Sequence, residues 1–358
     1  MGLLLNGLIA FLSLVWLGLM LINVAGLVKS HERYGTKGGK GRVLVIVPCK
    51  GTDIDLRGNL ESLKAQDYPS YKVVAVVDSN SDRAIPAIKK AGLDYIISSK
   101  GHRECSGKVA AIITAMQRFR NFDMYANIDS DVHCERNHIS ELVAPLNNKS
   151  VGVSTAYAYF NPVGGFWSVA KMVWGFVGNG MMESRLTRFV WGGSMAFRKS
   201  LVGTNEFKIF AKAVSDDMAI WHFAREKGLR VAYVDKKTAR VNTDDSLSEF
   251  TEWSNRQTAL SILGNRKVLY YGLAFYTAQA LLLVSGIILS AYSARYLVLL
   301  LPFAIGIYKT YIRSERPYLS ILPVCLIIDF VFIANLLSGA RRREIDWRGS
   351  RYRLVNPF

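Results

Sequence analysis

Two long apolar segments constrain this 358-residue chain more than any other feature. Leu3 to Val28 carries no charged residue, and Val268 to Ser338 is a second apolar block. A helix that crosses a bilayer needs about 20 apolar residues, so each block is long enough to span a membrane. Between them, residues 42–262, about 220 residues, have the size of a single large core. The sequence therefore predicts a globular domain with membrane segments at both ends.

The first apolar segment suits either a signal peptide or an uncleaved anchor. No basic residue precedes it, it is long for the apolar core of a signal peptide, and Lys29 and Arg33 follow it. We therefore predict a transmembrane anchor over residues 1–28. Its N-terminus is expected outside the cell, and the next domain in the cytosol.

The basic residues, which give a net charge of +17, cluster beside the apolar segments. The clusters contain Lys29, Arg33, Lys37, Lys40, Arg42, Arg341, Arg342, Arg343, Arg348, Arg351 and Arg353. Cytosolic segments that face anionic lipid have this pattern, so we expect the lipid bilayer as a partner. The clusters lack the aromatic-basic pattern of RNA-binding surfaces, so nucleic acid is not expected to bind. The four cysteines show no CxxC spacing, which argues against a zinc site or a disulfide framework.

Strand and helix patterns alternate through the first half of the central domain. Strands are expected at 42–48, 71–77, 95–97 and 124–128, and helices at 56–66, 85–91 and 108–118. This order predicts βαβ units and a parallel sheet. In such sheets ligands bind beyond the carboxyl ends of the strands. The sequence contains neither GxGxxG nor GxxxxGK[ST], which disfavours a dinucleotide-binding or P-loop enzyme.

Polar residues follow three of these strands in turn. The residues are Lys50 and Asp53, then Asp78 and Asp82, then Asp129 and Asp131. In an extended backbone, residues i and i+2 lie on the same face, so Asp129 and Asp131 can share one cation. A divalent metal that takes its other ligands from phosphate oxygens fits them, although two solvated carboxylates in a loop are the alternative.

The second half of the domain is less regular. We expect strands at 151–159, 189–197 and 230–234, and helices at 218–227 and 246–260. Gly192, Gly193 and Ser194 lie within the second of these strands, where they indicate either close approach of a ligand or a β-bulge. Residues 163–182 suit a helix in the membrane interface or a core helix. Either Ser215 or Asp216 can cap the helix that follows.

The ordered motifs resemble those of membrane-bound family 2 glycosyltransferases. The ceramide glucosyltransferase-like branch, which includes bacterial hopanoid glycosyltransferases, is the most similar. The matching motifs are VPCKG (47–51), DYP (67–69), VVDS (76–79), GK (107–108), DSD (129–131), GGSMAFR (192–198), SDD (215–217) and WRGxxYRL (347–354). The resemblance implies an α/β fold of the GT-A type, which binds nucleotide-diphospho-sugars, with transmembrane helices at both ends.

The resemblance also implies roles for particular residues. Donor-binding residues would be Pro48, Lys50, Gly51, Asp78, Lys108 and Asp129, and metal ligands for Mg²⁺ or Mn²⁺ would be Asp131 and Asp129. The general base would be Asp217, with Asp216 as the alternative. Contacts to the acceptor or the diphosphate are assigned to Gly193, Ser194, Trp253, Arg256 and Gln257. The family signature Gln/Arg-x-x-Arg-Trp is not kept, because Trp253 precedes Arg256 in this chain.

The C-terminal apolar block divides into three segments, 268–292, 294–312 and 318–338. Three full passes would put the basic tail, 339–358, outside, against the positive-inside rule. We therefore expect a re-entrant or interfacial segment near 270–279 and a cytosolic tail, with 347–352 near the active site. The catalytic domain is predicted over 42–262, in a multi-pass protein of the cell membrane.

The expected activity is the transfer of one sugar from a nucleotide-sugar, UDP-glucose or a related UDP-hexose, to a membrane lipid. A processive polysaccharide synthase, a polyprenyl-phosphate glycosyltransferase and a non-catalytic membrane scaffold are the alternatives. A synthase would be expected to have more membrane spans and an intact Gln-x-x-Arg-Trp signature. A scaffold would give no reason for carboxylates after successive strands.

Overall fold

The computed structural model describes residues 2–25, 41–99, 104–235 and 237–355. The chain forms two compact units that interleave along the sequence. The helical unit contains the described residues within 1–30, 164–180 and 244–342, and the α/β unit contains those within 31–163, 181–243 and 343–358. The basic residues Lys29, Arg33, Lys37 and Lys40 lie outside the described residues. Residues 244–262 thus belong to the helical unit. That the catalytic domain extends to residue 262 stays a prediction.

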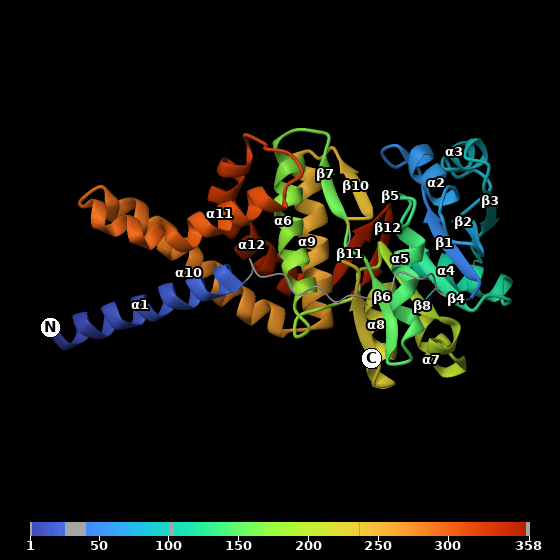
Figure 1. Ribbon diagram of the computed structural model, residues 1–358, viewed down its shortest axis with the longest axis horizontal. Helices are drawn as coiled ribbons and strands as arrows, with labels where there is room; N and C mark the ends of the chain where they lie inside the picture. Colours follow the sequence, from blue (N-terminus) through green and yellow to red (C-terminus); the bar gives the residue numbers. More distant parts are fainter. Residues whose placement is uncertain (1, 26–40, 100–103, 236, 356–358) are drawn as a thin grey trace. The chain divides into compact units, whose positions relative to one another are not determined.

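A seven-stranded sheet forms the centre of the α/β unit, in the order β3-β2-β1-β4-β8-β6-β9 (Figure 1). The strands are β1 (Val43–Cys49), β2 (Tyr71–Val77), β3 (Asp94–Ile97), β4 (Met124–Ile128), β6 (Val151–Thr155), β8 (Ser194–Arg198) and β9 (Arg230–Tyr233). β1 pairs in parallel with β2 and β4, and β2 pairs in parallel with β3. The carboxyl ends of these four strands therefore meet at one edge. Strand β8 is antiparallel to both of its neighbours.

Helices cover the sheet and connect its strands. They are α2 (Leu56–Lys64), α3 (Ile85–Lys90), α4 (Gly107–Arg118), α5 (His138–Val143), α7 (Thr204–Phe210) and α8 (Asp216–Glu226), with short 3₁₀ turns at Ala144–Asn147 and Lys199–Leu201. All of Val43 to Val47 is buried, as expected of a strand with both faces covered. Leu44 and Ile46 pack in one cluster with residues of α4 and α8. The alternate residues of β1 therefore point to the other face.

Two smaller sheets complete the α/β unit. One has the order β5-β10-β7, with β5 (Val132–Cys134), β10 (Ala239–Thr243) and β7 (Tyr159–Pro162). The other is a C-terminal hairpin of β11 (Glu344–Trp347) and β12 (Ser350–Arg353). The basic tail thus contains ordered strands that hydropathy and charge alone did not indicate.

The structure confirms the βαβ order of the first half and corrects two strands of the second half. The strand expected over 151–159 is two strands in different sheets, β6 and β7. The strand expected over 189–197 begins only at Ser194, and Gly192 and Gly193 form a turn before it. Apolar content at 189–191 suggested a strand, but the three residues lead into the turn instead.

The helical unit contains α1 (Gly2–Ala25), most of α6 (Phe166–Glu183), α9 (Leu247–Gly264), α10 (Lys267–Ser290), a 3₁₀ turn (Ala294–Leu300), α11 (Leu301–Arg313) and α12 (Ile321–Arg341). Among the described residues, three helical stretches are long and apolar enough to cross a membrane: Lys267–Ser290, Ala294–Arg313 and Ile321–Arg341. They coincide with the three predicted segments. Helix α10 is continuous through residues 270–279, and the number of passes stays a prediction.

Buried polar contacts join the helices of this unit. Asn335 of α12 donates to Ser254 Oγ and Asn255 Oδ1 of α9 at 3.2 and 3.0 Å, and it accepts from Trp174 Nε1 of α6. Lys309 of α11 donates to Asn23 of α1 at 3.2 Å. Between apolar helices such contacts favour one arrangement over others, because an unpaired polar group in an apolar environment is costly.

Candidate active site

The parallel strands bring Lys50 and Asp78 together. Cys49, at the end of β1, lies opposite Val77, at the end of β2, so the next residues of both strands are neighbours. Lys50 Nζ is 3.1 Å from Asp78 Oδ2, and both side chains keep almost two fifths of their surface exposed. Exposed ion pairs contribute little to stability. This pair is therefore open to a ligand with both donor and acceptor groups.

Lys108, in the first turn of α4, lies at the centre of a buried ionic cluster. Its ammonium is 2.7 Å from Asp129 Oδ1 and 3.2 Å from Asp216 Oδ2, and it donates to the carbonyl of Gly192 at 3.0 Å. Its side chain is only 10% exposed. Burial alone would lower the pKa of Lys108, but the two carboxylates outweigh burial and raise it. The three acceptors match the three N–H donors of an ammonium. Lys108 therefore connects three segments that are far apart in the sequence.

Asn127 in strand β4 extends this cluster. Its Nδ2 donates to Asp216 Oδ2 at 2.8 Å and to the carbonyl of Gly192 at 3.0 Å. Sequence reasoning missed this residue because it lies in a strand with an apolar pattern. Its position two residues before Asp129 was the available signal, since residues i and i+2 of a strand share a face.

Asp216 and Asp217 begin helix α8 and have different surroundings. Ser215 is the N-cap, because its hydroxyl accepts from the N–H of Met218. Asp216 is 3% exposed, and its burial raises its pKa to about 7 although Lys108 opposes the shift. Asp217 is half-buried, and its Oδ2 accepts from the N–H of Gly192 at 3.0 Å. The two neighbouring carboxylates thus share the Gly192 turn, but only Asp216 belongs to the buried cluster.

Asp129 and Asp131 flank Ser130, whose side chain is tied to the loop after β1. Ser130 Oγ donates to Asp53 Oδ2 at 2.5 Å, and the Ser130 carbonyl accepts from Asn59. Asp129 is already paired with Lys108, and both Asp129 and Asp131 are half-buried. No group of three or more His, Cys, Asp or Glu side chains in the described part of the chain could enclose a metal. Two carboxylates suit Mg²⁺ or Mn²⁺ with phosphate and water as its other ligands.

The turn at Gly193 is closely packed. A Cβ on Gly193 would lie 2.2 Å from the ring of Trp191, so only glycine fits without a shift. The carbonyl of Gly193 accepts from the N–H of Asp129 at 3.0 Å, which joins this turn to the Asp129 loop. Ser194 begins β8, and its hydroxyl faces His138 Nε2 at 2.9 Å. The Gly192–Ser194 motif therefore forms a junction between the Asp129 and Asp217 segments.

His138 is a buried residue of α5. Its Nδ1 lies 2.8 Å from Thr238 Oγ1, and its two hydrogen bonds are fully enclosed. Burial lowers the pKa of His138 to about 4. The neutral ring is therefore the form that the folded protein accommodates.

We expect the α/β unit to lose stability as the pH falls from 6.5 to 4. The folded pKa of His138 lies below its unfolded value of about 6.5, so the unfolded state binds more protons in this window. The stabilisation is complete above pH 6.5, and about 3 kcal/mol of it is lost as the pH reaches 4. His138→Gln should flatten this part of a plot of melting temperature against pH. His222→Gln on α8 is the control and should keep the slope; an unchanged slope in His138→Gln would refute the assignment.

Trp253, Arg256 and Gln257 lie on α9, which belongs to the helical unit, whereas the residues described above belong to the α/β unit. Trp253 has local partners there: its ring lies 4.8 Å from Lys171 Nζ and packs edge-on against Trp174. Lys171 also pairs with Asp245 at 2.9 Å. The α9 residues therefore stay candidates for acceptor contacts by sequence position alone.

The C-terminal hairpin contributes residues for which no individual role was predicted. Arg348 contacts Asp53, Ser350 contacts Lys50, and Tyr352 contacts Gly107. These hairpin residues thus contact Asp53, Lys50 and Gly107 within the α/β unit, but their nearness to the active site stays a prediction. Their signal in the sequence was the WRGxxYRL motif, which has no acidic or metal-binding pattern of its own.

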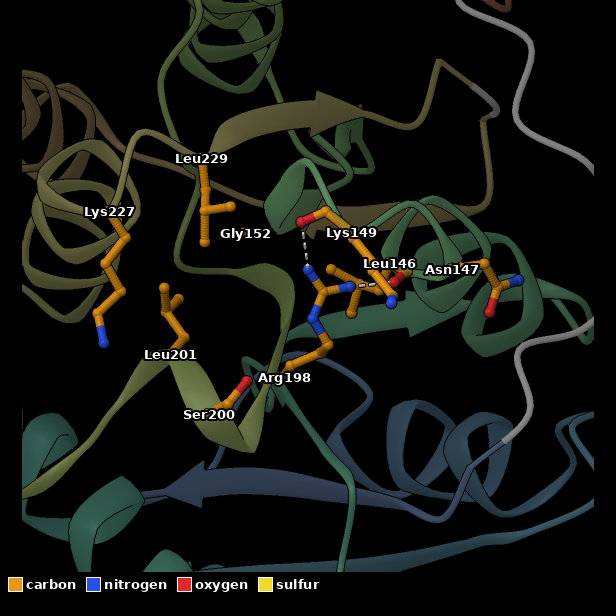
Figure 2. A pocket seen from close by; sticks show the side chains of 9 residues that line it. All are labelled: Leu146, Asn147, Lys149, Gly152, Arg198, Ser200, Leu201, Lys227 and Leu229. Carbon is orange, nitrogen blue, oxygen red and sulfur yellow. Dashed lines mark hydrogen bonds between the residues drawn. The ribbon is translucent and has the colours of Figure 1, made fainter.

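A pocket elsewhere in the α/β unit contains none of the predicted donor-binding residues. Its walls include Arg198, Lys149 and Lys227 (Figure 2). Arg198 ends β8 opposite Met124, the first residue of β4, so the pocket lies at the sheet edge away from Asp129. The Arg198 guanidinium already donates to backbone carbonyls, among them those of Leu146 and Val151. It therefore supports the chain around β6.

A solved structure with a similar fold covers nearly the whole chain. It is the mannosyltransferase PcManGT from Pyrobaculum calidifontis, in complex with GDP-Man and Mn²⁺, with a TM-score of 0.56 and 16% identity over 92% of this chain and 96% of that one. Glucosyl-3-phosphoglycerate synthase from Mycobacterium tuberculosis, in complex with Mn²⁺, UDP and glucosyl-3-phosphoglycerate, is more distant. It has a TM-score of 0.44 and 14% identity over 66% of this chain and 86% of that one. The first likeness shows a fold of the GT-A type, and the second is too low to add to it.

The family model for glycosyl transferase family 21 matches residues 8–356. This is a ceramide glucosyltransferase-like family, in agreement with that part of the resemblance, although its number is 21 and not 2. The narrower hopanoid branch stays a prediction. The match covers the apolar helices near the C-terminus, the acidic motifs and the C-terminal hairpin alike. The chain therefore belongs to glycosyl transferase family 21.

Proposed function

We propose that this glycosyltransferase transfers a single hexose from a UDP-hexose to a hydroxyl group of a membrane lipid, with inversion at the anomeric carbon. One observation carries the proposal: the carboxylates of Asp129 and Asp216 meet at Lys108 beyond the ends of parallel strands. Asp131 and Asp217 flank this cluster and are more exposed than Asp216. A site that transfers a sugar must bind the donor and also remove a proton from the acceptor, so the residues for both tasks must be close together.

The donor nucleotide is assigned to the ends of β1 and β2. Asp78 can accept from a uracil N–H or a ribose hydroxyl, and Lys50 can donate to an oxygen of the same ligand. Gly51 has a φ of +73°, a backbone conformation that glycine adopts readily because it has no side chain. Pro48 precedes it in β1. Lys108 would act through Asp129, because its ammonium is already enclosed by three acceptors.

Asp131, supported by Asp129, would hold Mg²⁺ or Mn²⁺ together with the diphosphate. When bound, the cation would stabilise negative charge on the leaving nucleoside diphosphate. The complex of PcManGT with Mn²⁺ is in keeping with such a cation. Asp131 is the better ligand of the two, since Asp129 also neutralises Lys108.

Asp217 is assigned as the general base. Asp216 is buried and engaged by Lys108 and Asn127, so it is poorly placed to take a proton from an acceptor. Asp217 keeps access to solvent, and the N–H of Gly192 orients its carboxylate. It would accept the proton as the hydroxyl attacks the face of the sugar opposite the diphosphate. A single displacement of this kind inverts the configuration.

A lipid acceptor is proposed because the same chain carries three helices of membrane-spanning length. A soluble acceptor would not require them. Gly193 and Ser194 would contact the diphosphate or the acceptor from the β8 turn, and Trp253, Arg256 and Gln257 are the corresponding candidates on α9. The catalytic domain is proposed to face the cytosol, where nucleotide-sugars are made.

The test is to incubate membranes that contain the full chain with radiolabelled UDP-glucose, UDP-galactose or GDP-mannose, with MnCl₂ or with EDTA. Lipids are then extracted into organic solvent and separated, and the anomeric configuration of the product is determined by NMR. We expect label in the lipid phase from a UDP-hexose with Mn²⁺, and little with EDTA. Membranes without the protein provide the background.

Other outcomes would identify other functions. Transfer from GDP-mannose alone would replace the proposed donor, and a long insoluble polymer would indicate a processive synthase. Label that mild acid releases from the lipid would indicate a polyprenyl-phosphate acceptor. No transfer from any donor would contradict the proposal.

A further inference from the structure

The turn of the C-terminal hairpin has an uncommon backbone. Arg348 and Gly349 both have positive φ, at 48° and 74°, between Trp347 and Ser350. Two such residues form the tight turn that suits the twist of a hairpin. Glycine adopts this conformation freely, but for arginine it costs about 1 kcal/mol or more. A charged side chain at this position needs interactions that offset the cost.

Arg348 finds these interactions in the loop after β1. Its Nη2 is 2.6 Å from Asp53 Oδ1, and its Nη1 donates to the carbonyl of Lys50 at 2.7 Å. The other oxygen of Asp53 accepts from Ser130, which stands between Asp129 and Asp131. One short path of charged and polar contacts therefore runs from the hairpin tip to the proposed metal ligands.

The same hairpin contacts two more segments of the donor site. Ser350 Oγ accepts from Lys50 Nζ at 3.1 Å, and Lys50 is the partner of Asp78. The Tyr352 hydroxyl accepts from the N–H of Gly107 at 3.1 Å, directly before Lys108. The first turn of a helix has N–H groups without partners in the helix, so this contact fixes the start of α4.

Charge also favours this arrangement. Asp53, Asp129 and Asp131 would repel one another at short range without a nearby cation. Burial alone would lower the pKa of Arg348, but these three carboxylates raise it, so the guanidinium remains positive. The planar guanidinium of arginine can donate to a carboxylate and a carbonyl at once, in fixed directions. The ammonium of lysine fixes the directions of its hydrogen bonds less closely.

We propose that the C-terminal hairpin organises the donor site, and that Arg348 is a positioning residue for the divalent cation of the bound nucleoside diphosphate. Acting through Asp53 and Ser130, Arg348 sets the orientation of Asp129 and Asp131. This inference rests on the proposed function, because it needs a metal-dependent nucleotide donor. It adds the C-terminal hairpin to the parts of the chain on which donor binding depends.

The test compares Arg348→Gln with Arg351→Gln in the purified full chain. Both variants lose one positive charge from the same hairpin, but Arg351 is 69% exposed and pairs with Glu344 and Asp346 of the hairpin itself. Mn²⁺ binding is measured by electron paramagnetic resonance, with and without UDP. Loss of groups that orient metal ligands typically lowers metal affinity by about 10- to 100-fold, and we expect Arg348→Gln to fall in this range. Arg351→Gln should change the affinity by less than about 2-fold.

A double-mutant cycle tests the path through Asp53. In an Asp53→Asn background, Arg348→Gln should have little further effect on Mn²⁺ affinity, since the two residues act through one contact. Should Arg348→Gln not fold, Ser130→Ala breaks the same path without changing the hairpin and is expected to weaken binding in the same direction. Melting temperatures identify a variant that fails to fold.

Two results would overturn the inference in different ways. Wild-type affinity in Arg348→Gln or, where that variant does not fold, in Ser130→Ala would refute the role of Arg348 and leave the proposed function intact. Absence of Mn²⁺ binding by the wild-type protein, both alone and with UDP, would contradict the metal-dependent donor site and with it the inference.

Discussion

Replacement of Asp217 by Asn is expected to lower the rate of sugar transfer by about 10³-fold, within the range for loss of a general base. Asparagine keeps the size of the side chain and can still accept from the N–H of Gly192, but it cannot take a proton. The measurement is the initial rate of label transfer to lipid at saturating donor. Binding of UDP with Mn²⁺ should stay within about 3-fold of wild type, because the substitution leaves Asp78, Asp129 and Asp131 unchanged.

Asp94→Asn is the matched control for this variant. Asp94 is an exposed residue at the start of β3, paired with Lys72 at 2.8 Å, and it lies at the sheet edge away from the site. The control should keep the wild-type rate. A tenth or more of the wild-type rate in Asp217→Asn would exclude Asp217 as the base, and Asp216→Asn would then be examined in the same assay.

The first half of the fold was predictable because its signals are local. A short β-branched run such as Val43–Val47 is buried on both faces, and a helix follows each of β1, β2 and β3. The order of these elements then requires parallel pairing, which gathers Lys50, Asp78 and Asp129 at one edge. No long-range information was needed for that step.

The second half was harder to predict because its pairing is non-local. Strand β8 lies between β4 and β6, antiparallel to both, and nothing in residues 189–198 specifies those partners. The run 151–159 reads as one strand, yet β7 leaves the main sheet to pair with β10, more than 70 residues further along. Local hydrophobicity cannot show where such a chain changes sheets.

The acidic residues of the candidate site could be predicted from the sequence, but the contacts that join them could not. Asp129, Asp216 and Lys108 could be proposed from motifs, but their shared cluster depends on Asn127 and on the carbonyl of Gly192. A backbone carbonyl has no sequence signal. The C-terminal hairpin illustrates the same difficulty, since Arg348 and Asp53 are in contact although almost 300 residues separate them in the sequence.

Replacement of Lys108 by Met is expected to destabilise the protein strongly, by about 3–5 kcal/mol, because it leaves Asp216 buried without its cation. A loss of this size should lower the melting temperature of the purified full chain by about 6–20 °C. Lys72→Met is the control: Lys72 forms an exposed ion pair with Asp94, so its loss should cost less than about 1 kcal/mol.

The double variant Lys108→Met with Asp216→Asn distinguishes an unpaired charge from a loss of packing. It removes the buried carboxylate as well, while the introduced amide can still contact Asn127, so it should recover more than half of the lost stability.

Acid should have a similar effect on the single variant. Burial already raises the pKa of Asp216 to about 7 against the influence of Lys108, and without Lys108 it should rise further. An Asp whose folded pKa lies above its unfolded value of about 3.9 is favoured in its protonated form, so the deficit should be greatest at high pH and shrink as the pH falls through the raised pKa. A deficit that is equal at pH 9 and pH 6, and that Asp216→Asn does not relieve, would show that Lys108 stabilises the protein by packing alone.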